Sequence, residues 1–140
     1  MFVGLDIMKR ILSYLFLLAV LATACKKEGE ANKDPLYKRW FVYKIEKHYT
    51  DKSGNADRNF KSWSNIIDDR EMFFEFRRQG QFLTYQGMGS YTRTGPTITY
   101  TIAEDAGQYQ YQLRENCLVL SFVVEKTSYN EHVTLEMRPF

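Results

Sequence analysis

The sequence predicts an all-β fold, an antiparallel up-and-down meander closed into a small barrel of about eight strands. Aromatic residues make up 16% of the 140 residues, mostly as 10 Tyr and 10 Phe, and these side chains favour pleated, half-buried surfaces. Apolar side chains recur at alternate positions from Met72 to Ile102 and again after it. Short turn sequences separate these stretches, and strands joined by tight turns must run antiparallel. Closure would remove the two exposed edges of such a sheet.

The N-terminal segment, residues 1–24, predicts export. Met8-Lys9-Arg10 is basic, and residues 11–24 form an apolar run without charge. The run is shorter than the about 20 residues of a membrane-spanning helix and suits a signal peptide. Residues 1–7 fit poorly before such a signal, which makes Met8 an alternative start. An ordinary secretory signal or an uncleaved anchor helix are the other interpretations.

The apolar run ends in Leu21-Ala22-Thr23-Ala24-Cys25, in which small residues directly precede the cysteine. This pattern resembles the lipobox of bacterial lipoproteins, which implies cleavage before Cys25 and attachment of acyl chains such as palmitate to it. Several acyl chains hold a protein on a membrane without a spanning helix. Residues 25–33 are polar and charged, typical of a flexible tether, and resemble the surface-export signals of Bacteroidetes lipoproteins. We expect an outer-membrane location, on the periplasmic face or the cell surface.

Residues 34–140 are predicted to form the barrel domain. Asp34-Pro35 fits the start of a short helix or turn. The stretch Trp40–Tyr49 has the β-branched and aromatic character of a first strand, but apolar residues occur on both of its faces. A loop is predicted at 50–59. Residues 60–70 are interpreted as either a strand or a lid over one end of the barrel, with the strand favoured.

Period-2 alternation locates the remaining strands. In the first of them Met72, Phe74 and Phe76 share one face. Turns are predicted at Arg78–Gly80, at Thr94-Gly95-Pro96 and at Glu115-Asn116, with a bend or bulge at Gly87 and Gly89. A longer loop is predicted at 103–107 and another at 126–131. The predicted strands are 72–77, 82–85, 90–93, 97–102, 108–113, 118–124 and 132–138.

One combination of motifs carries a family resemblance. The pattern consists of Trp40 on the first strand, Phe74-x-Phe76-x-x-x-Gly80-x-Phe82, Gly89-Ser90-Tyr91, an Ile/Tyr strand and Leu113-x-x-x-x-Leu118-x-Leu120. It resembles the lipocalin-like lipoproteins of Bacteroidetes, a group mostly of unknown function, over residues 36 to 138. The resemblance implies a lipocalin-like barrel on a lipid anchor, with the membrane as a partner through Cys25.

A row of large rings is predicted to face the barrel interior. An eight-stranded barrel is just wide enough to be filled by side chains or to hold one small ligand, and the bulk of these rings favours filling. If they surround a cavity, the tyrosine hydroxyls would orient an amphipathic ligand or the rings would stack on a sugar. The candidate interior and ligand-binding residues are Trp40, Phe74, Phe76, Phe82, Tyr91, Tyr100, Tyr109, Tyr111 and Phe122.

No motif in the sequence indicates catalysis, a cofactor or a metal. His48 and His132 lack a ligand spacing, the carboxylates at 68–71 match no calcium loop, and Cys117 shows no activating partner. The net charge of +2 does not indicate the strongly basic surface that is typical of a nucleic-acid-binding protein. We therefore expect a non-enzymatic binding module for a small apolar or amphipathic ligand. The alternative is a structural or interaction lipoprotein with a filled barrel, whose loops bind a protein or glycan.

Overall fold

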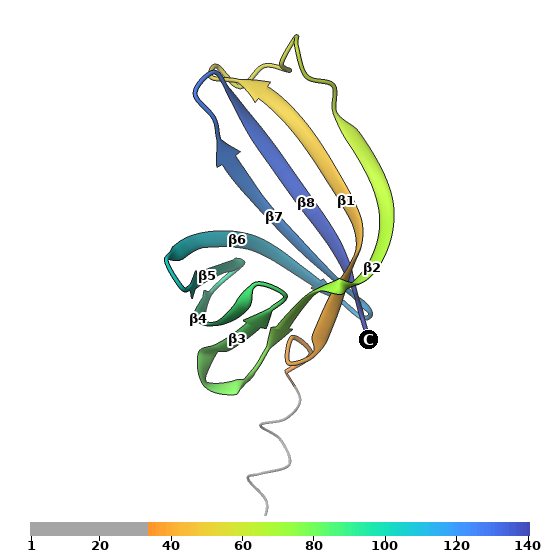
Figure 1. Ribbon diagram of the computed structural model, residues 1–140, viewed down its shortest axis with the longest axis vertical. Helices are drawn as coiled ribbons and strands as arrows, with labels where there is room; N and C mark the ends of the chain where they lie inside the picture. Colours follow the sequence, from red (N-terminus) through yellow and green to blue (C-terminus); the bar gives the residue numbers. More distant parts are fainter. Residues whose placement is uncertain (1–33) are drawn as a thin grey trace, which may run out of the picture. The chain divides into compact units, whose positions relative to one another are not determined.

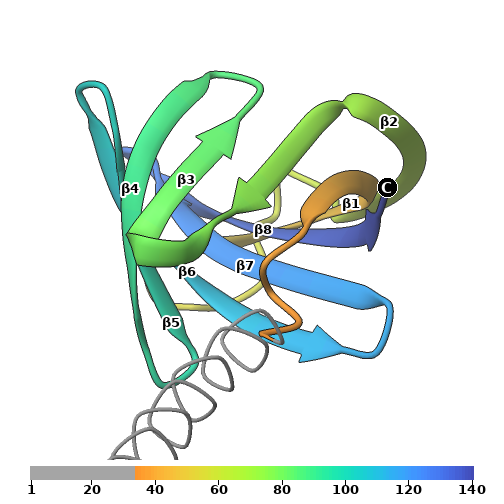
Figure 2. The same cartoon turned by 90° about the horizontal axis from the view of Figure 1, so that it is seen from below.

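The computed structural model describes residues 34–140 and shows a closed barrel of eight strands. Each strand pairs antiparallel with the next one, and the last pairs with the first (Figures 1 and 2). The predicted all-β, up-and-down barrel is confirmed. The predicted signal peptide, the tether and Cys25 lie outside the described residues. The strands are β1 (Arg39–Asp51), β2 (Trp63–Phe76), β3 (Gln81–Thr84), β4 (Gly87–Thr94), β5 (Thr97–Ile102), β6 (Asp105–Arg114), β7 (Cys117–Glu125) and β8 (Tyr129–Pro139).

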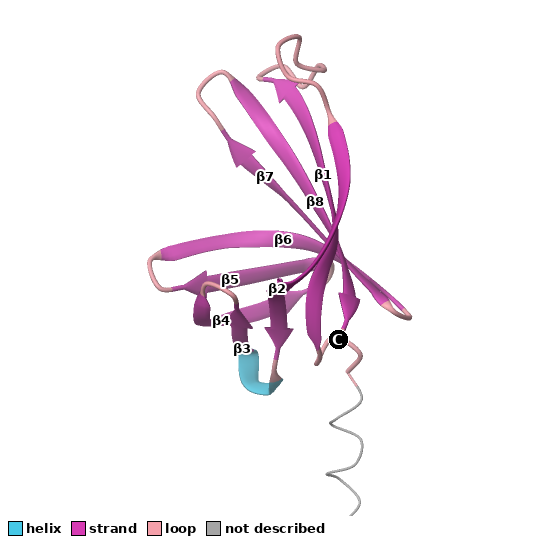
Figure 3. Ribbon diagram, turned by 45° about the vertical axis from the view of Figure 1, so that its right-hand side comes forward, coloured by secondary structure: helices cyan, strands magenta, loops and turns pink. Residues whose placement is uncertain are grey.

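The strands differ in length, so one side of the barrel extends further than the other. β1 and β2 have 13 and 14 residues, whereas β3 and β5 have 4 and 6. Figure 1 shows β1, β7 and β8 running together past the level of β3–β6. Loops and turns join all the strands, and the only helical element among the described residues is one 3-10 turn, η1 (Arg78–Gly80), before β3 (Figure 3). At the start of the domain, Asp34-Pro35 leads into a turn and not into a helix.

A β-bulge in β1 explains the mixed alternation of the first strand. Val42 and Lys44 pair with consecutive residues of β8, which leaves Tyr43 as an extra residue in the ladder. Before the bulge, Trp40 and Val42 are buried in the core. After it the inward positions are odd-numbered, beginning with Ile45, which lines the barrel cavity. One inserted residue thus changes the inward-facing positions from even-numbered to odd-numbered residues.

The outer face of β1 is also covered, next to the C-terminus. The Phe41 ring meets Phe140 edge-on, with 5.5 Å between ring centroids, and the Arg70 guanidinium lies 4.8 Å from the Phe41 ring centroid. The Arg39 guanidinium lies 4.6 Å from the ring centroid of Phe73. Contacts of this kind are attractive because the ring face carries negative charge density. Around Phe41, both faces of β1 are therefore covered by apolar contacts, as the sequence indicates for the start of this strand.

Residues 63–76 form one strand, which resolves the ambiguity over 60–70 and joins it to the predicted strand 72–77. The pairing of β2 with β1 jumps from Phe73 to Asp69, so an irregularity interrupts the period-2 pattern there. The Asp69 carboxylate accepts hydrogen bonds from the backbone N–H groups of Glu71 at 2.9 Å and Met72 at 3.3 Å. These bonds satisfy backbone donors that the ladder leaves open.

Three predicted boundaries between β3 and β6 are wrong. β3 and β4 meet at a two-residue turn, Tyr85-Gln86, and β4 begins at Gly87 and not at 90. Gly89 is neither a bend nor a bulge, because it pairs in register with Phe82 and Ile102. A Cβ there would lie 2.0 Å from the carbonyl oxygen of Thr101, so glycine permits close strand contact. The predicted loop 103–107 shrinks to a two-residue turn, in which Ala103 adopts φ 50°. Non-glycine residues hold positive φ only rarely, so composition did not reveal this turn.

The core fills one end of the barrel. Its fully buried side chains come from the N-terminal turn and from most of the strands, and the predicted inward rows of β5, β7 and β8 are confirmed. Trp40 anchors the N-terminal turn, because its indole N–H donates to the carbonyl oxygen of Leu36 at 3.1 Å. The largest fully buried side chains are Trp40, Phe76, Phe82, Leu36, Ile98, Leu118, Leu120, Met137 and Val42.

Candidate functional site

A cavity of ≈ 330 Å³ lies within the barrel beyond the filled end. Its walls are mainly apolar and aromatic, and several charged or amide side chains also line it. This composition is typical of a small-molecule site, in which apolar walls surround a few polar groups. The lining residues are Ile45, Lys47, Met72, Phe74, Thr84, Tyr85, Gln86, Tyr100, Ile102, Asp105, Tyr109, Phe122, Val124, Glu131, Val133 and Leu135.

Four of the predicted interior aromatics fill the closed end and do not line the cavity. Trp40, Phe76, Phe82 and Tyr91 are all buried. The rings of Phe76 and Phe82 stack with centroids 4.9 Å apart, and Tyr91 meets Phe76 edge-on at 5.2 Å. Tyr91 also donates its hydroxyl to the backbone carbonyl of Arg77 at 3.1 Å. These rings form the floor of the barrel, as the predicted filling requires.

Four others, Phe74, Tyr100, Tyr109 and Phe122, line the cavity together. Tyr100 and Tyr109 stack with centroids 4.5 Å apart and planes inclined by 13°, and Phe122 meets Tyr109 edge-on at 5.4 Å. The ninth candidate, Tyr111, packs partly buried against the core and is not among the lining residues. The interior is therefore filled at one end and hollow at the other.

The stacked tyrosines depend on a glycine in β6. Gly107 pairs with Tyr100 across β5 and β6, and a Cβ at that position would lie 2.8 Å from the Tyr100 hydroxyl oxygen and 3.1 Å from its ring. The absence of a side chain lets the Tyr100 ring lie over Gly107 and reach Tyr109. Burial raises the pKa of Tyr109, and a hydrogen bond with Tyr100 adds to the effect. The Tyr109 side chain therefore presents a neutral phenol to the cavity.

Charged residues of the cavity were missed by the sequence reasoning. Lys47 of β1 and Glu131 of β8 form an ion pair, and Asp105 lies at the start of β6. Lys47 faces inward only because the bulge at Tyr43 reverses the strand faces. Its contact with Glu131 joins residues 84 positions apart. A count of inward positions that allowed for one inserted residue in β1 would have found Lys47.

Aromatic side chains from β1, β2, β8 and the loop between β1 and β2 gather beside the cavity. The Phe60 ring lies 4.4 Å from that of Tyr129 and 5.3 Å from that of Tyr49, centroid to centroid. Trp63 donates its indole N–H to the Tyr49 hydroxyl at 3.3 Å, and the Lys47 ammonium lies 5.7 Å from the centroid of its ring. Phe60 and Trp63 are each 42% exposed. This apolar cluster is open to solvent.

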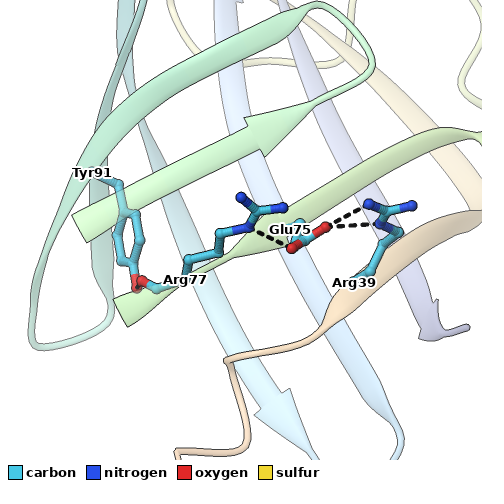
Figure 4. A network of polar contacts seen from close by, with 4 residues as sticks. All are labelled: Arg39, Glu75, Arg77 and Tyr91. Atoms are coloured by element: carbon cyan, nitrogen blue, oxygen red, sulfur yellow. Dashed lines mark hydrogen bonds and ion pairs between the residues drawn. The ribbon is translucent and has the colours of Figure 1, made fainter. Parts of the chain in front are cut away.

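An ion-pair network fastens β1 to β2 near the filled end (Figure 4). Two guanidinium nitrogens of Arg39 lie 2.8 Å from one carboxylate oxygen of Glu75, and Arg77 Nε lies 2.5 Å from the other. The hydrogen bond from Arg77, and then the one from Arg39, lower the pKa of Glu75 below its ordinary value, against the opposing effect of partial burial. The network is structural and lies apart from the cavity lining.

The remaining chemical candidates have structural partners. His48 Nδ1 lies 2.8 Å from Ser62 Oγ, and His132 Nε2 lies 3.0 Å from Thr50 Oγ1. Burial raises the pKa of the Cys117 thiol, which disfavours the thiolate. Within residues 34–140 no three His, Cys, Asp or Glu side chains gather in a way that could hold a metal ion.

The described part of the chain contains no helix that is long and apolar enough to cross a membrane. No protein-family model matches the sequence, and neither a curated protein nor a solved structure matches the chain. The assignment of the candidate site therefore depends on the geometry and the lining residues of the cavity.

Proposed function

We propose that the protein is an exported, lipid-anchored barrel that binds one small apolar or amphipathic ligand. The observation that carries the proposal is the cavity of ≈ 330 Å³, with its aromatic wall and its few charged groups. Ligand sites commonly measure about 300–1,000 Å³, so this cavity suits a small molecule. The proposed activity is binding and not catalysis.

Two adjacent valines of β7 allow a test of where the ligand binds. Val124 lines the cavity, whereas Val123 is 50% exposed and is not a lining residue. Val124→Trp would occupy space that the ligand needs. With N-phenyl-1-naphthylamine as a neutral fluorescent probe, we expect binding to weaken about tenfold or more in this variant. Val123→Trp adds the same ring outside the cavity and serves as the control.

The outcomes of this titration separate clearly. Loss of probe binding in Val124→Trp alone supports the cavity as the site. Equal weakening in both variants would place the probe elsewhere on the protein. If the native protein does not bind the probe or any co-purified small molecule, the binding proposal fails. Circular dichroism of each variant shows whether the barrel remains folded.

The lipid anchor requires a separate test. We propose that acyl chains on Cys25 hold the protein on the outer membrane, at its periplasmic face or at the cell surface, because small residues directly precede this cysteine. Cys25→Ala should abolish metabolic labelling with a palmitate analogue and move the protein to the soluble fraction. Cys117→Ala should leave both unchanged. Unchanged membrane retention of Cys25→Ala would instead indicate an uncleaved apolar helix.

A further inference from the structure

The charges that line the cavity do not balance. Lys47 contributes the only Lys or Arg side chain, and Asp105 and Glu131 contribute carboxylates. Lys47 and Glu131 neutralise each other in their ion pair, in which the Glu131 side chain is only 13% exposed. Asp105 takes part in none of the ion pairs found within residues 34–140. The exposed Asp105 carboxylate therefore remains at the cavity without an ion-pair partner.

Aromatic rings that line the cavity add to the attraction that this carboxylate exerts on a cation. Tyr100 and Tyr109 stack, and Phe74 and Phe122 each meet Tyr109 edge-on, with centroids 6.2 Å and 5.4 Å away. Tyr85 also lines the cavity and meets Phe74 edge-on at 6.2 Å. The face of an aromatic ring attracts cations, and the attraction grows when the cation loses water. The cavity is thus lined by rings from β2, β5, β6, β7 and the β3–β4 turn, together with the Asp105 carboxylate, which forms no ion pair.

We propose that the cavity selects amphipathic ligands with a positively charged head group, an amine or a quaternary ammonium, over carboxylates with the same tail. This inference rests on the proposed ligand-binding function. The apolar side chains of β1, β2, β7 and β8 take the tail, and the head group lies near Asp105 and the stacked pair Tyr100 and Tyr109.

An anionic ligand meets the opposite situation. The only lysine of the cavity already donates to Glu131. A carboxylate that recruited Lys47 would leave the largely buried Glu131 without its partner, which is costly. A carboxylate placed near Asp105 would face a like charge. A positive head group encounters neither difficulty, because Asp105 is available and the Lys47–Glu131 pair stays intact.

A matched set of octyl compounds tests the selectivity. Isothermal titration of the full chain with octyltrimethylammonium, 1-octanol and octanoate compares three head groups on one tail. We expect octyltrimethylammonium to bind about fivefold more tightly than octanoate, with octanol between them. Asp105→Asn should reduce this preference to about twofold or less. Glu104→Gln removes the neighbouring charge outside the cavity lining and should leave the preference unchanged.

A second variant covers the case in which Asp105→Asn disturbs the β5–β6 turn. Lys47→Met releases the Glu131 carboxylate and should increase the preference for octyltrimethylammonium. If octanoate and octyltrimethylammonium bind equally well, the selectivity is refuted while the ligand-binding function stands. If none of the three compounds binds, the proposed function itself fails. If Glu104→Gln lowers the preference as much as Asp105→Asn does, the effect comes from overall charge and the assignment to the cavity is wrong.

Discussion

At the scale of single residues, Glu75 shows how one carboxylate can stabilise the barrel in a pH-dependent way. It bridges Arg39 and Arg77, and these hydrogen bonds hold its pKa below the ordinary value. A group whose pKa is lower in the folded state stabilises the fold above its unfolded pKa. This contribution is lost as the pH falls from about 4.5 through the folded pKa.

Glu75→Gln therefore has a defined signature. At pH 7 we expect it to lower the free energy of unfolding by about 1 kcal/mol, because the two arginines are partly exposed and screened by water. The difference between the variant and the native protein should shrink as the pH falls below about 4.5. Urea denaturation at several pH values measures this effect. Glu71→Gln, at an exposed position of the same strand, is the control, and a difference that grows on acidification would contradict the assignment.

At the scale of elements, the pairing of β4 with β5 depends on Gly89. A Cβ at this position would lie 2.0 Å from the carbonyl oxygen of Thr101, a backbone atom that cannot move without shifting the strand. Gly89→Ala should lower the free energy of unfolding by about 2 kcal/mol or more. Ser90→Ala changes the exposed neighbour and should have little effect. Chemical denaturation compares the two, and equal stability would mean that β5 yields at low cost.

The β-bulge at Tyr43 is the other decisive feature at this scale. It places Trp40 and Val42 in the core and Ile45 and Lys47 in the cavity on the same strand. Without the extra residue, Lys44 and Glu46 would face inward and Lys47 would face outward. The bulge therefore determines that Lys47 is the cation of the cavity lining and positions it beside Glu131 on β8.

At the scale of the whole molecule, closure depends on the pairing of the first and last strands. β1 and β8 pair from Trp40 with Pro139 to Asp51 with Tyr129, and the backbone N–H of Phe140 donates to the carbonyl oxygen of Arg39 at 3.2 Å. The two ends of the barrel domain therefore lie side by side. The loop between β1 and β2, in contrast, is exposed and carries few ladder bonds.

This arrangement predicts that a circular permutant will fold. A chain with a flexible linker from Phe140 to Asp34 and new ends between Phe60 and Lys61 keeps every strand pairing. We expect native-like circular dichroism and a single cooperative unfolding transition. New ends between Leu120 and Ser121 would interrupt β7, which pairs on both sides, and should prevent folding. Equal behaviour of the two permutants would show that the continuity of β7 is unimportant.

The candidate site was predictable only in part. Alternation identified Phe74, Tyr100, Tyr109 and Phe122 as inward, and these residues do line the cavity. The same pattern also selected Trp40, Phe76, Phe82 and Tyr91, which fill the floor. The alternation of side chains along a strand indicates which face a residue occupies, but it does not indicate how far along the barrel axis that residue lies. Depth depends on the stagger of neighbouring strands.

The sequence by itself determined the all-β class, the antiparallel order of the strands and most inward rows, because side-chain alternation and tight turns are local properties. Only the tertiary structure decided the register in which β1 pairs with β8, the effect of the bulge at Tyr43 and the division of the interior into a packed floor and a cavity. These features arise from contacts between residues far apart in the chain, such as Lys47 and Glu131. Their geometry is set when the sheet closes, and no local pattern records it.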